Sequence, residues 1–398
     1  MKILVVGAEP RTLINFRGPL IRAMLAEGHE VSAAANGREP GTEAKLQQMG
    51  VSYYPIHIAH AGLNPLVDIT TLLDLIRLIR RIKPDLVFSY TIKPVIYGGL
   101  AARFCGVKNI FSMIEGLGYA FMPWDSLIHV ITSIIAKNLY RVGLLSSRKV
   151  FFLNPDDLEQ FIKEGYVSRH RAVLLNGIGI DLEYFKKEQL SETSIIRFLM
   201  IARLIKDKGV REYINAARNI RARYQHVEFV LAGDLDQNPN SIRQEELDLW
   251  LKEGTIKYAG FIDDVRPLHR DCHVFILPSF YREGVPRTTL ESMATGRAVI
   301  TTDSTGCRET VNQAAGASGE RIIKEGAGNL KFGRNGILVP VKDVDALVAA
   351  IEFFIDHPEQ IEAMGRESRA YARERYDVHK VNARILQEMG LIDNNSNY

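Results

Sequence analysis

Two carboxylates on either side of an expected helix start carry the strongest chemical signal in this sequence. Glu283 and Glu291 lie eight residues apart within residues 277–291, LPSFYREGVPRTTLE. An apolar, strand-like run stops at Leu277, a loop follows, and a helix is expected to begin near Thr288. A helix N-terminus offers free backbone N–H groups and partial positive charge, which favour a phosphate. A phosphate cradle between two hydroxyl-binding carboxylates is what a nucleotide-sugar site requires.

A second pair of side chains could bind the same anion. Arg203 and Lys208 stand five residues apart, just after a strand predicted at residues 195–201. Two fixed positive charges would stabilise a diphosphate while its bond to a sugar breaks. Taken alone, this spacing is more often a pair of surface charges, so the interpretation depends on its combination with Glu283.

Strands and helices alternate along both halves of the chain. The first half opens with a strand at residues 2–6 and a helical pattern at 13–27, and this rhythm continues to residue 153. A second series of strands runs through residues 195–301, and residues 343–390 have a helical pattern. The alternation predicts an α/β protein with two Rossmann-like, doubly wound parallel-sheet domains facing a cleft.

The rhythm is interrupted at residues 175–181, which are rich in glycine and other turn formers. We place the domain junction there. The predicted boundaries are residues 1–178 for the N-terminal domain and 190–375 for the C-terminal domain. Residues 376–398 are predicted to be a helical tail that returns to the N-terminal domain.

Composition narrows the class of protein. Cys105, Cys272 and Cys307 are widely spaced, which argues against a disulfide framework or a zinc site and favours a reducing cytoplasm. The first apolar run is too short for a signal peptide, and no stretch reaches the ~18 apolar residues of a membrane span. Residues 1–190 carry 22 Lys/Arg against 17 Asp/Glu, a net charge of +5, whereas the remainder carries 28 against 30, a net charge of −2. The basic half suits nucleic acid, anionic lipid or a phosphorylated acceptor, and equally suits ordinary solvated helices.

Several short motifs, taken in order, resemble those of glycosyltransferase family four, whose members are retaining enzymes of the GT-B fold. They are the Glu-x7-Glu pair Glu283/Glu291, residues 201–203 followed by Lys208-Gly209, residues 232–234, 277–279 and 306–309, and the hinge at 176–178. Each motif alone is weak, but their joint order and spacing make a strong signal that covers nearly the whole chain. No Gly-x-Gly-x-x-Gly follows the first strand, which disfavours an NAD-type site there.

The resemblance implies a UDP-sugar donor bound by the C-terminal domain. Glu283 would contact the transferred sugar, and Glu291 would accept hydrogen bonds from the ribose hydroxyls, although Glu291 could instead serve only the helix dipole. Arg203 and Lys208 would be catalytic cations on the diphosphate. The other donor-binding residues would be Gly7, Ile262, Gly284, Val285, Pro286 and Thr288. No metal-binding motif accompanies them, so we expect neither a metal nor another cofactor.

Glu115 is a further catalytic candidate. It follows the strand predicted at residues 109–112, within IEGLGY at 114–119. Many relatives have a histidine in this region, against the donor sugar. A general-base or sugar-hydroxyl role for Glu115 is therefore a hypothesis, beside a purely structural role at the start of a helix.

A further resemblance concerns the acceptor. Residues 15–20, NFRGPL, together with the EGLG motif, resemble bacterial enzymes that extend undecaprenyl-diphosphate-linked sugars. The N-terminal domain would then bind the lipid-linked saccharide, with Arg17 and Lys93 holding its phosphates. An amphipathic core helix whose arginines are solvated would explain the same residues equally well. Basic residues among apolar ones at 77–83 and 126–149 would suit peripheral attachment to the inner face of the cytoplasmic membrane, but core helices show the same pattern. No nucleic acid is expected as a partner.

The sequence thus predicts a retaining hexosyl or N-acetylhexosaminyl transferase of polysaccharide or glycan assembly. The resemblance also implies retention without a nucleophilic carboxylate, with the departing phosphate oxygen taking the acceptor's proton on the same face, so that the site works by positioning and electrostatics. Two other functions remain open. One is a nucleotide-sugar epimerase or hydrolase on the same scaffold, and the other is a non-catalytic nucleotide-binding assembly protein.

Overall fold

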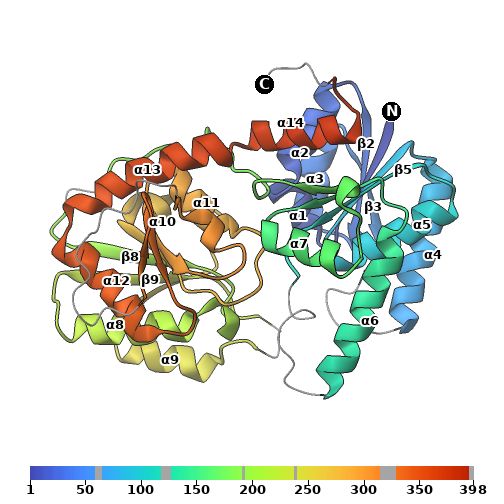
Figure 1. Cartoon of the computed structure of the whole chain (residues 1–398). Helices are drawn as coiled ribbons and strands as arrows, with labels where there is room; N and C mark the ends of the chain where they lie inside the picture. The colour runs from blue at the N-terminus through green and yellow to red at the C-terminus, as the bar shows by residue number, and fades with distance from the viewer. Residues whose placement is uncertain (59–64, 118–126, 191–192, 237–239, 314–328, 394–398) are drawn as a thin grey trace. The chain divides into compact units, whose positions relative to one another are not determined.

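The computed structural model describes residues 1–58, 65–117, 127–190, 193–236, 240–313 and 329–393. The chain divides into two units (Figure 1). Unit 1 comprises Met1–Gly179 with Val378–Tyr398, and unit 2 comprises Ile180–Asp377. The break falls within the junction predicted at 175–181. Residues 180–189, which the prediction left between the domains, are part of unit 2.

The described part of unit 1 is built on a seven-stranded parallel sheet. Its strands are β1 (Lys2–Val6), β2 (Glu30–Asn36), β3 (Ser52–Ile56), β4 (Leu86–Tyr90), β5 (Asn109–Ile114), β6 (Lys149–Phe152) and β7 (Ala172–Leu174). The strand order is β3-β2-β1-β4-β5-β6-β7. Strands such as Leu86–Tyr90 are buried at every position, which explains their continuous apolar runs.

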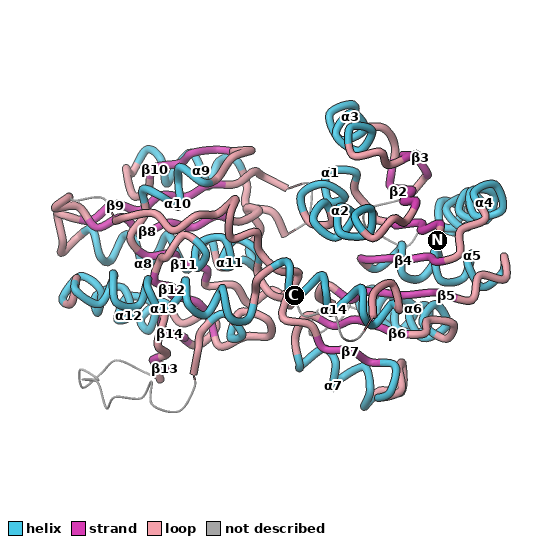
Figure 2. Tube along the Cα trace, turned by 90° about the horizontal axis from the view of Figure 1, so that it is seen from above, coloured by secondary structure: helices cyan, strands magenta, loops and turns pink. Residues whose placement is uncertain are grey.

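Helices cover both faces of this sheet. They are α1 (Pro10–Asn15), α2 (Gly18–Ala26), α3 (Pro40–Gln48), α4 (Pro65–Ile82), the π-helix η1 (Pro94–Gly98), α5 (Gly99–Phe104), α6 (Leu127–Leu144), α7 (Pro155–Lys163), the 3-10 helix η3 (Arg169–Arg171) and α14 (Val378–Met389). Figures 1 and 2 show α4, α5 and α6 along one face, with α2 and α14 on the other. The single helix predicted at 13–27 was wrong, because the chain breaks between α1 and α2, where Pro19 has no backbone N–H to continue a helix.

The described part of unit 2 contains a second seven-stranded sheet. Its strands are β8 (Ile196–Ile201), β9 (Val227–Ala232), β10 (Lys257–Gly260), β11 (Val274–Leu277), β12 (Ala298–Thr302), β13 (Lys331–Phe332) and β14 (Gly336–Val339). The order is β10-β9-β8-β11-β12-β14-β13, and the pairing is parallel except between β13 and β14. The predicted pair of doubly wound α/β sheets is confirmed.

The helices of unit 2 alternate with these strands. They are the 3-10 helices η4 (Lys206–Lys208) and η5 (Arg308–Thr310), and the helices α8 (Val210–Arg221), α9 (Gln244–Lys252), α10 (Arg266–Asp271), α11 (Arg287–Ala294), α12 (Val344–Asp356) and α13 (Glu359–Arg375). Together with α14, the last two account for the helical pattern at 343–390.

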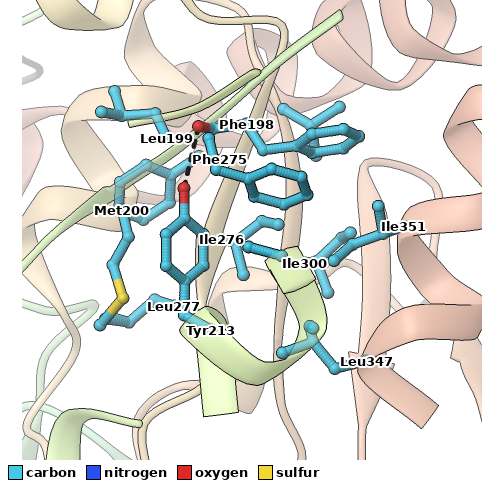
Figure 3. Packing of buried hydrophobic residues seen from close by; sticks show 14 of the residues in the cluster. Phe198, Leu199, Met200, Tyr213, Phe275, Ile276, Leu277, Ile300, Leu347 and Ile351 are labelled. Atoms are coloured by element: carbon cyan, nitrogen blue, oxygen red, sulfur yellow. Dashed lines mark hydrogen bonds between the residues drawn. The ribbon is translucent and has the colours of Figure 1, made fainter. Parts of the chain in front are cut away.

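The core of unit 2 is packed between the sheet and these helices (Figure 3). Tyr213 reaches into it from α8, and its hydroxyl donates to the carbonyl oxygens of Phe198 at 3.0 Å and Val230 at 2.9 Å. These bonds satisfy the phenol in a place where an unpaired hydroxyl would be costly. Leu347 and Ile351 of α12 are fully buried in the same cluster.

Strand order marks where a ligand would bind in each unit. In unit 2 the chain runs outward from β8 to β10 and then returns to β11 beside β8, so the order reverses between β8 and β11. In unit 1 it reverses in the same way between β1 and β4. Ligands of open parallel sheets bind at the carboxyl ends of the strands next to such a reversal. The segments that follow β8 and β11 contain Arg203, Lys208 and Glu283.

Candidate active site

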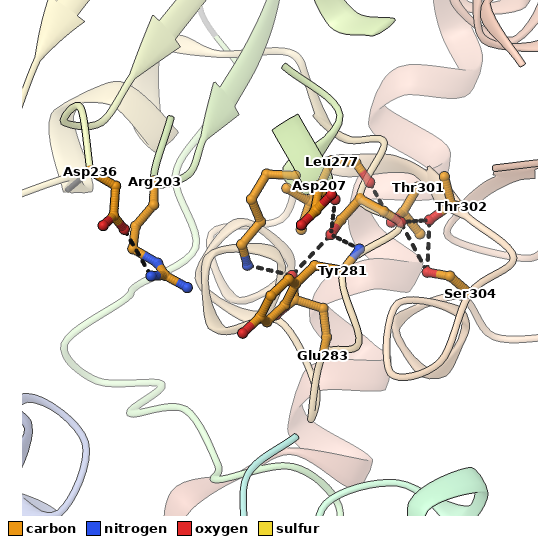
Figure 4. A network of polar contacts seen from close by, with 11 residues as sticks. Arg203, Asp207, Asp236, Leu277, Tyr281, Glu283, Thr301, Thr302 and Ser304 are labelled. Atoms are coloured by element: carbon orange, nitrogen blue, oxygen red, sulfur yellow. Dashed lines mark hydrogen bonds and ion pairs between the residues drawn. The ribbon is translucent and has the colours of Figure 1, made fainter. Parts of the chain in front are cut away.

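The loop between β11 and α11 is held by the end of the neighbouring strand β12 (Figure 4). The hydroxyl of Thr301 donates to the carbonyl oxygen of Leu277 at 2.7 Å. The carbonyl oxygen of Ser279 accepts from the hydroxyls of Thr302 and Ser304, the latter at 3.0 Å. These hydroxyls satisfy carbonyl oxygens at the end of β11 and at the start of the loop. The first residues of the loop are therefore held in one conformation.

Two glycines let neighbouring backbone approach this loop. Gly306 has a φ of +76°, and a Cβ there would lie 2.3 Å from the carbonyl oxygen of Gly284 and 2.6 Å from that of Glu283. Gly209 has a φ of +77°, and a Cβ there would lie 2.1 Å from the carbonyl oxygen of Pro278. Both positions need glycine for the left-handed backbone and for the space.

Lys208 and Glu283 form an ion pair at the centre of this region. Their side chains are only 14% and 11% exposed, and Oε1 of Glu283 also accepts from the hydroxyl of Ser279 at 3.0 Å. Removing two charges from water costs several kcal/mol per ion, which the attraction between them does not always recover. A nearly buried charge pair therefore adds little to the stability of the fold. Its place at the carboxyl edge of a sheet makes it a candidate functional feature.

Tyr281 links Arg203 to this pair (Figure 4). The guanidinium carbon of Arg203 lies 6.0 Å from the centroid of the Tyr281 ring, and the ammonium of Lys208 lies 5.3 Å from it. Arg203 also donates to Asp236 at 2.9 Å. Burial raises the pKa of Tyr281 although the charge of Arg203 opposes the shift, so the phenol keeps its proton at neutral pH. The structure thus brings Arg203, Lys208 and Glu283 together, and their action on a diphosphate stays a prediction.

The helix α11 begins where the sequence predicted a helix. Pro286 precedes its first residue, and no side chain caps this end. The first backbone N–H groups of a helix have no acceptor within the helix itself, which suits an anion. The other residues predicted here are Gly284, Val285 and Thr288, of which the first two are buried.

Glu291 lies one turn further along α11. Its side chain is 9% exposed, and Oε1 accepts from Nε of Arg287 at 2.9 Å. The contact with Arg287 is compatible with both predicted roles of Glu291, which are binding of the ribose hydroxyls and stabilisation of the helix dipole. Ile262, predicted near the base, follows β10 in a partly exposed turn beside Phe261, which is 57% exposed.

Gly7, Arg17 and Glu115 gather at the carboxyl edge of the unit 1 sheet. The guanidinium of Arg17, 2% exposed, pairs with Glu115, donates to the sulfur of Met113 at 3.1 Å and lies 4.6 Å from the Tyr90 ring centroid. A Cβ on Gly7 would lie 2.3 Å from the Tyr90 hydroxyl. The guanidinium of Arg17 thus holds the carboxylate of Glu115 in place. The predicted ligand roles of all three stay predictions.

Lys93 also has an internal carboxylate partner. Its ammonium donates to Asp68 of α4 at 2.8 Å, and both side chains are about nine-tenths buried, at 10% and 9% exposure. Burial raises the pKa of the nearby Tyr97, and the charge of Asp68 adds to the shift. The predicted contact of Lys93 with acceptor phosphates is untested. Gly118 and Tyr119 of the EGLG segment lie outside the described residues.

Cys307 is the cysteine next to the candidate site. Cys307 follows Gly306 and is fully buried, and burial raises the pKa of its thiol to about 11, so the reactive thiolate is scarce at neutral pH. In the described ranges of the chain, no three His, Cys, Asp or Glu side chains gather as metal ligands would.

Each of the two units matches a known protein family. Residues 2–152 match the family described as "Glycosyl transferase 4-like", and residues 196–357 match "Glycosyl transferases group 1". The chain belongs to the GT-B glycosyltransferases. The first match lies in unit 1 and the second in unit 2, so each sheet belongs to one of the two glycosyltransferase domains.

Two curated relatives of this glycosyltransferase act on lipid-linked sugars. The N,N'-diacetylbacillosaminyl-diphospho-undecaprenol alpha-1,3-N-acetylgalactosaminyltransferase of Campylobacter jejuni is 27% identical over 79% of this chain and 84% of its own length. The UDP-Gal:alpha-D-GlcNAc-diphosphoundecaprenol alpha-1,3-galactosyltransferase of Escherichia coli is 27% identical over 71% of this chain and 70% of its own. The predicted family resemblance is therefore confirmed.

Solved structures share the fold of this glycosyltransferase. The Anabaena protein HepE, in complex with UDP-glucose, is 18% identical and aligns over 98% of this chain and all of its own, with a TM-score of 0.74. A glycosyltransferase from Rickettsia africae is also 18% identical and aligns over 99% of both chains, with a TM-score of 0.73.

Sequence reasoning missed the partners of the predicted residues. Tyr281 lies inside the segment 277–291, yet one tyrosine in a loop carries no signal of its own. Asp236 and Asp68 were missed because they lie 33 and 25 residues from the cations that they bind. A parallel sheet places such distant segments together at one edge, which spacing alone does not reveal.

Proposed function

We propose that this glycosyltransferase moves a hexose or N-acetylhexosamine from a UDP-sugar to an undecaprenyl-diphosphate-linked saccharide, with retention, in the assembly of a surface polysaccharide or glycan. Two relatives named as transferases to diphospho-undecaprenol sugars support the acceptor class. The Lys208–Glu283 pair, set beside Arg203 at the strand-order reversal, is the structural observation that carries the donor site.

In the proposed donor complex, the cations of Arg203 and Lys208 face the diphosphate. Glu283 exchanges part of its contact with Lys208 for the hydroxyls of the transferred sugar. The uncapped start of α11 holds phosphate oxygens through backbone N–H groups and the hydroxyl of Thr288. Glu291 takes the ribose hydroxyls, and the base lies near Ile262.

The proposed reaction breaks the bond between the anomeric carbon and the departing phosphate oxygen. The acceptor hydroxyl attacks the same face and gives its proton to that oxygen, which leaves as part of UDP. Positive charge at Arg203 and Lys208 stabilises the negative charge that develops on the diphosphate. The protein therefore contributes position and electrostatics rather than a covalent intermediate.

Donor-only incubation tests the proposed reaction class. With a UDP-sugar and no acceptor, we expect almost no UDP release and no epimerised sugar, and addition of lipid-linked acceptor should start release. Rapid donor turnover without acceptor would instead identify a hydrolase or an epimerase. If simultaneous loss of Glu283, Arg203 and Lys208 leaves the cellular function intact, the chain is a non-catalytic assembly protein.

Metal independence is part of the proposal, because two fixed cations can neutralise the leaving diphosphate. In excess EDTA the transfer rate should stay within about twofold of the untreated rate, since no lost ion would remove the charge of Arg203 and Lys208. Loss of activity in EDTA, restored by magnesium or manganese, would contradict this.

Peripheral attachment to the inner face of the cytoplasmic membrane is the last part of the proposal. Among the described residues, no helix is long and apolar enough to cross a bilayer. Helix α6 carries Lys137 and Arg141 and has no acidic residue. Apolar side chains are nevertheless exposed on α4, on α6 and directly after α6, with exposed fractions between 42% and 77%: Leu66, Ile69, Leu73, Ile131, Ile134, Ile135, Val142 and Leu145.

The spacing of these side chains supports the membrane as their partner. Leu66, Ile69 and Leu73 follow one another by three and four residues, which places them on one face of α4. Ile131 and Ile134 are likewise three residues apart on α6. Both helices begin at the carboxyl edge of the unit 1 sheet, because each follows one of its strands. The exposed apolar side chains within 66–73 and 131–135 lie toward that edge, the basic residues within 77–81 and 137–141 follow, and Val142 and Leu145 lie toward the other end. Such a surface suits anionic lipid, with apolar groups inserted between headgroups.

A vesicle assay with a matched control tests this surface. Ile131→Gln with Ile134→Gln should weaken sedimentation with vesicles of phosphatidylglycerol and phosphatidylethanolamine by roughly tenfold or more, because two inserted side chains are lost. The control, Leu249→Gln with Leu251→Gln, changes two exposed leucines of α9 in unit 2 and should bind as the wild type does. Equal binding by the α6 variant would contradict the proposal.

A further inference from the structure

A buried imidazole without a hydrogen bond to the described residues lies close to the carboxylate of Glu291. His269, on α10, is fully buried, and neither ring nitrogen has a hydrogen-bond partner among the described residues. Its Nε2 lies 3.7 Å from Oε2 of Glu291. A buried polar group without a partner costs stability, so its retention calls for an explanation.

The surroundings of His269 prevent it from turning elsewhere. Its ring centroid lies 6.3 Å from that of Phe185 and 5.8 Å from that of Phe275, so aromatic rings pack around it. The carbonyl oxygen of His269 accepts from Nε of Arg297, itself 1% exposed, at 2.9 Å. The backbone is thus held in place, and Glu291 is the nearest acidic group to the imidazole that the structure records.

We propose that His269 is a positioning residue, which donates its Nε2–H to Oε2 of Glu291 and so orients this carboxylate toward two vicinal hydroxyls. This inference rests on the proposed function, in which those hydroxyls belong to the donor's ribose. The present 3.7 Å is longer than a hydrogen bond, so the contact forms when the carboxylate turns on binding ribose.

Counting acceptor positions supports this arrangement. An ionised carboxylate has about four lone-pair sites, two on each oxygen. Nε of Arg287 occupies one site on Oε1, and Nε2 of His269 would occupy one on Oε2. One site then remains on each oxygen, which matches a diol that donates two hydrogen bonds. Without His269 the carboxylate can rotate. Its two remaining acceptor positions are then no longer held toward the two hydroxyls of the diol.

Two substitutions separate this role from a structural one. His269→Phe keeps an aromatic ring between Phe185 and Phe275 but removes both nitrogens. Because it removes two unpaired polar atoms from an apolar place, we expect its thermal midpoint to equal or exceed that of the wild type. His269→Gln restores an N–H donor at a similar reach. Ile351→Val, a conservative change in the unit 2 core, is the control.

The measurement is the affinity of each variant for UDP and for 2′-deoxy-UDP by calorimetry. The wild type should prefer UDP by roughly tenfold or more, as expected for a hydroxyl bonded to a charged group. In His269→Phe we expect UDP to bind about tenfold more weakly and 2′-deoxy-UDP almost unchanged. His269→Gln should restore most of the preference, and Ile351→Val should keep all of it.

Each other outcome contradicts a defined part of the inference. A folded His269→Phe that prefers UDP as strongly as the wild type does would overturn the role of His269 and leave the proposed function standing. Equal weakening of both ligands would show a general packing role instead. A wild-type protein that fails to bind UDP would overturn the proposed donor, and the inference with it.

Discussion

Replacing Lys208 with alanine should lower the turnover number at saturating donor by about a hundredfold or more, the usual cost of losing a preorganised charge partner. Lys208 is one of the two cations beside Tyr281, and its ammonium already pairs with Glu283. The variant therefore loses a positive charge where negative charge develops and leaves a nearly buried carboxylate without its cation. The measurement is steady-state release of UDP with lipid-linked acceptor present.

The control lies two residues away, in the same 3-10 helix. Lys206→Ala removes an equal charge from η4, without the contact to Glu283. Its turnover should stay close to that of the wild type. Because loss of one partner of a buried ion pair destabilises by about 3–5 kcal/mol, circular dichroism must first show that Lys208→Ala is folded. A folded Lys208→Ala with less than a threefold loss of turnover would remove this cation from the mechanism.

Gly306→Ala is expected to lower both stability and activity. The new methyl group would lie 2.3 Å from the carbonyl oxygen of Gly284 and 2.6 Å from that of Glu283, so this backbone must move. The substitution also forces alanine into a left-handed conformation, at φ +76°, which costs about 1–2 kcal/mol by itself. We expect a fall of several degrees in melting temperature and roughly a tenfold or larger fall in kcat/KM, because displaced groups lose their preorganisation.

Gly254→Ala separates the two causes. Gly254 lies in the same unit with a φ of +67°, and a Cβ there meets nothing within 4 Å. This variant should show the loss of stability that comes from backbone strain, and it should keep wild-type kcat/KM. If both alanine variants lose activity to the same extent, the close approach of Gly306 to the Glu283 backbone has no part in the activity.

Buried strands were the most predictable parts of the fold. Strand β11 and the helix α11 were placed from an apolar run, Pro278 and the polar residues that follow, because strand burial and helix starts are local properties. The single helix predicted at 13–27 was wrong. The apolar periodicity continues across the break between α1 and α2. The helix nevertheless ends there, because Pro19 has no backbone N–H to continue it.

The site was predictable in its residues but not in their pairing. Arg203, Lys208 and Glu283 could be named because their spacing follows a known motif. That Lys208 contacts Glu283 depends on the adjacency of β8 and β11, strands separated in sequence by β9 and β10. The ion pair between Arg17 and Glu115 likewise joins residues 98 positions apart. Such contacts are products of the sheet topology rather than of any local pattern.

Mass spectrometry of the lipid product tests the central claim most directly. The purified protein would be incubated with a panel of UDP-sugars and bacterial membrane extracts that supply undecaprenyl-diphosphate-linked saccharides. We predict that one UDP-sugar increases the mass of a lipid-linked saccharide by a single hexose or N-acetylhexosamine, with equal release of UDP. Transfer to water-soluble acceptors alone, with no change in the lipid fraction, would contradict the account.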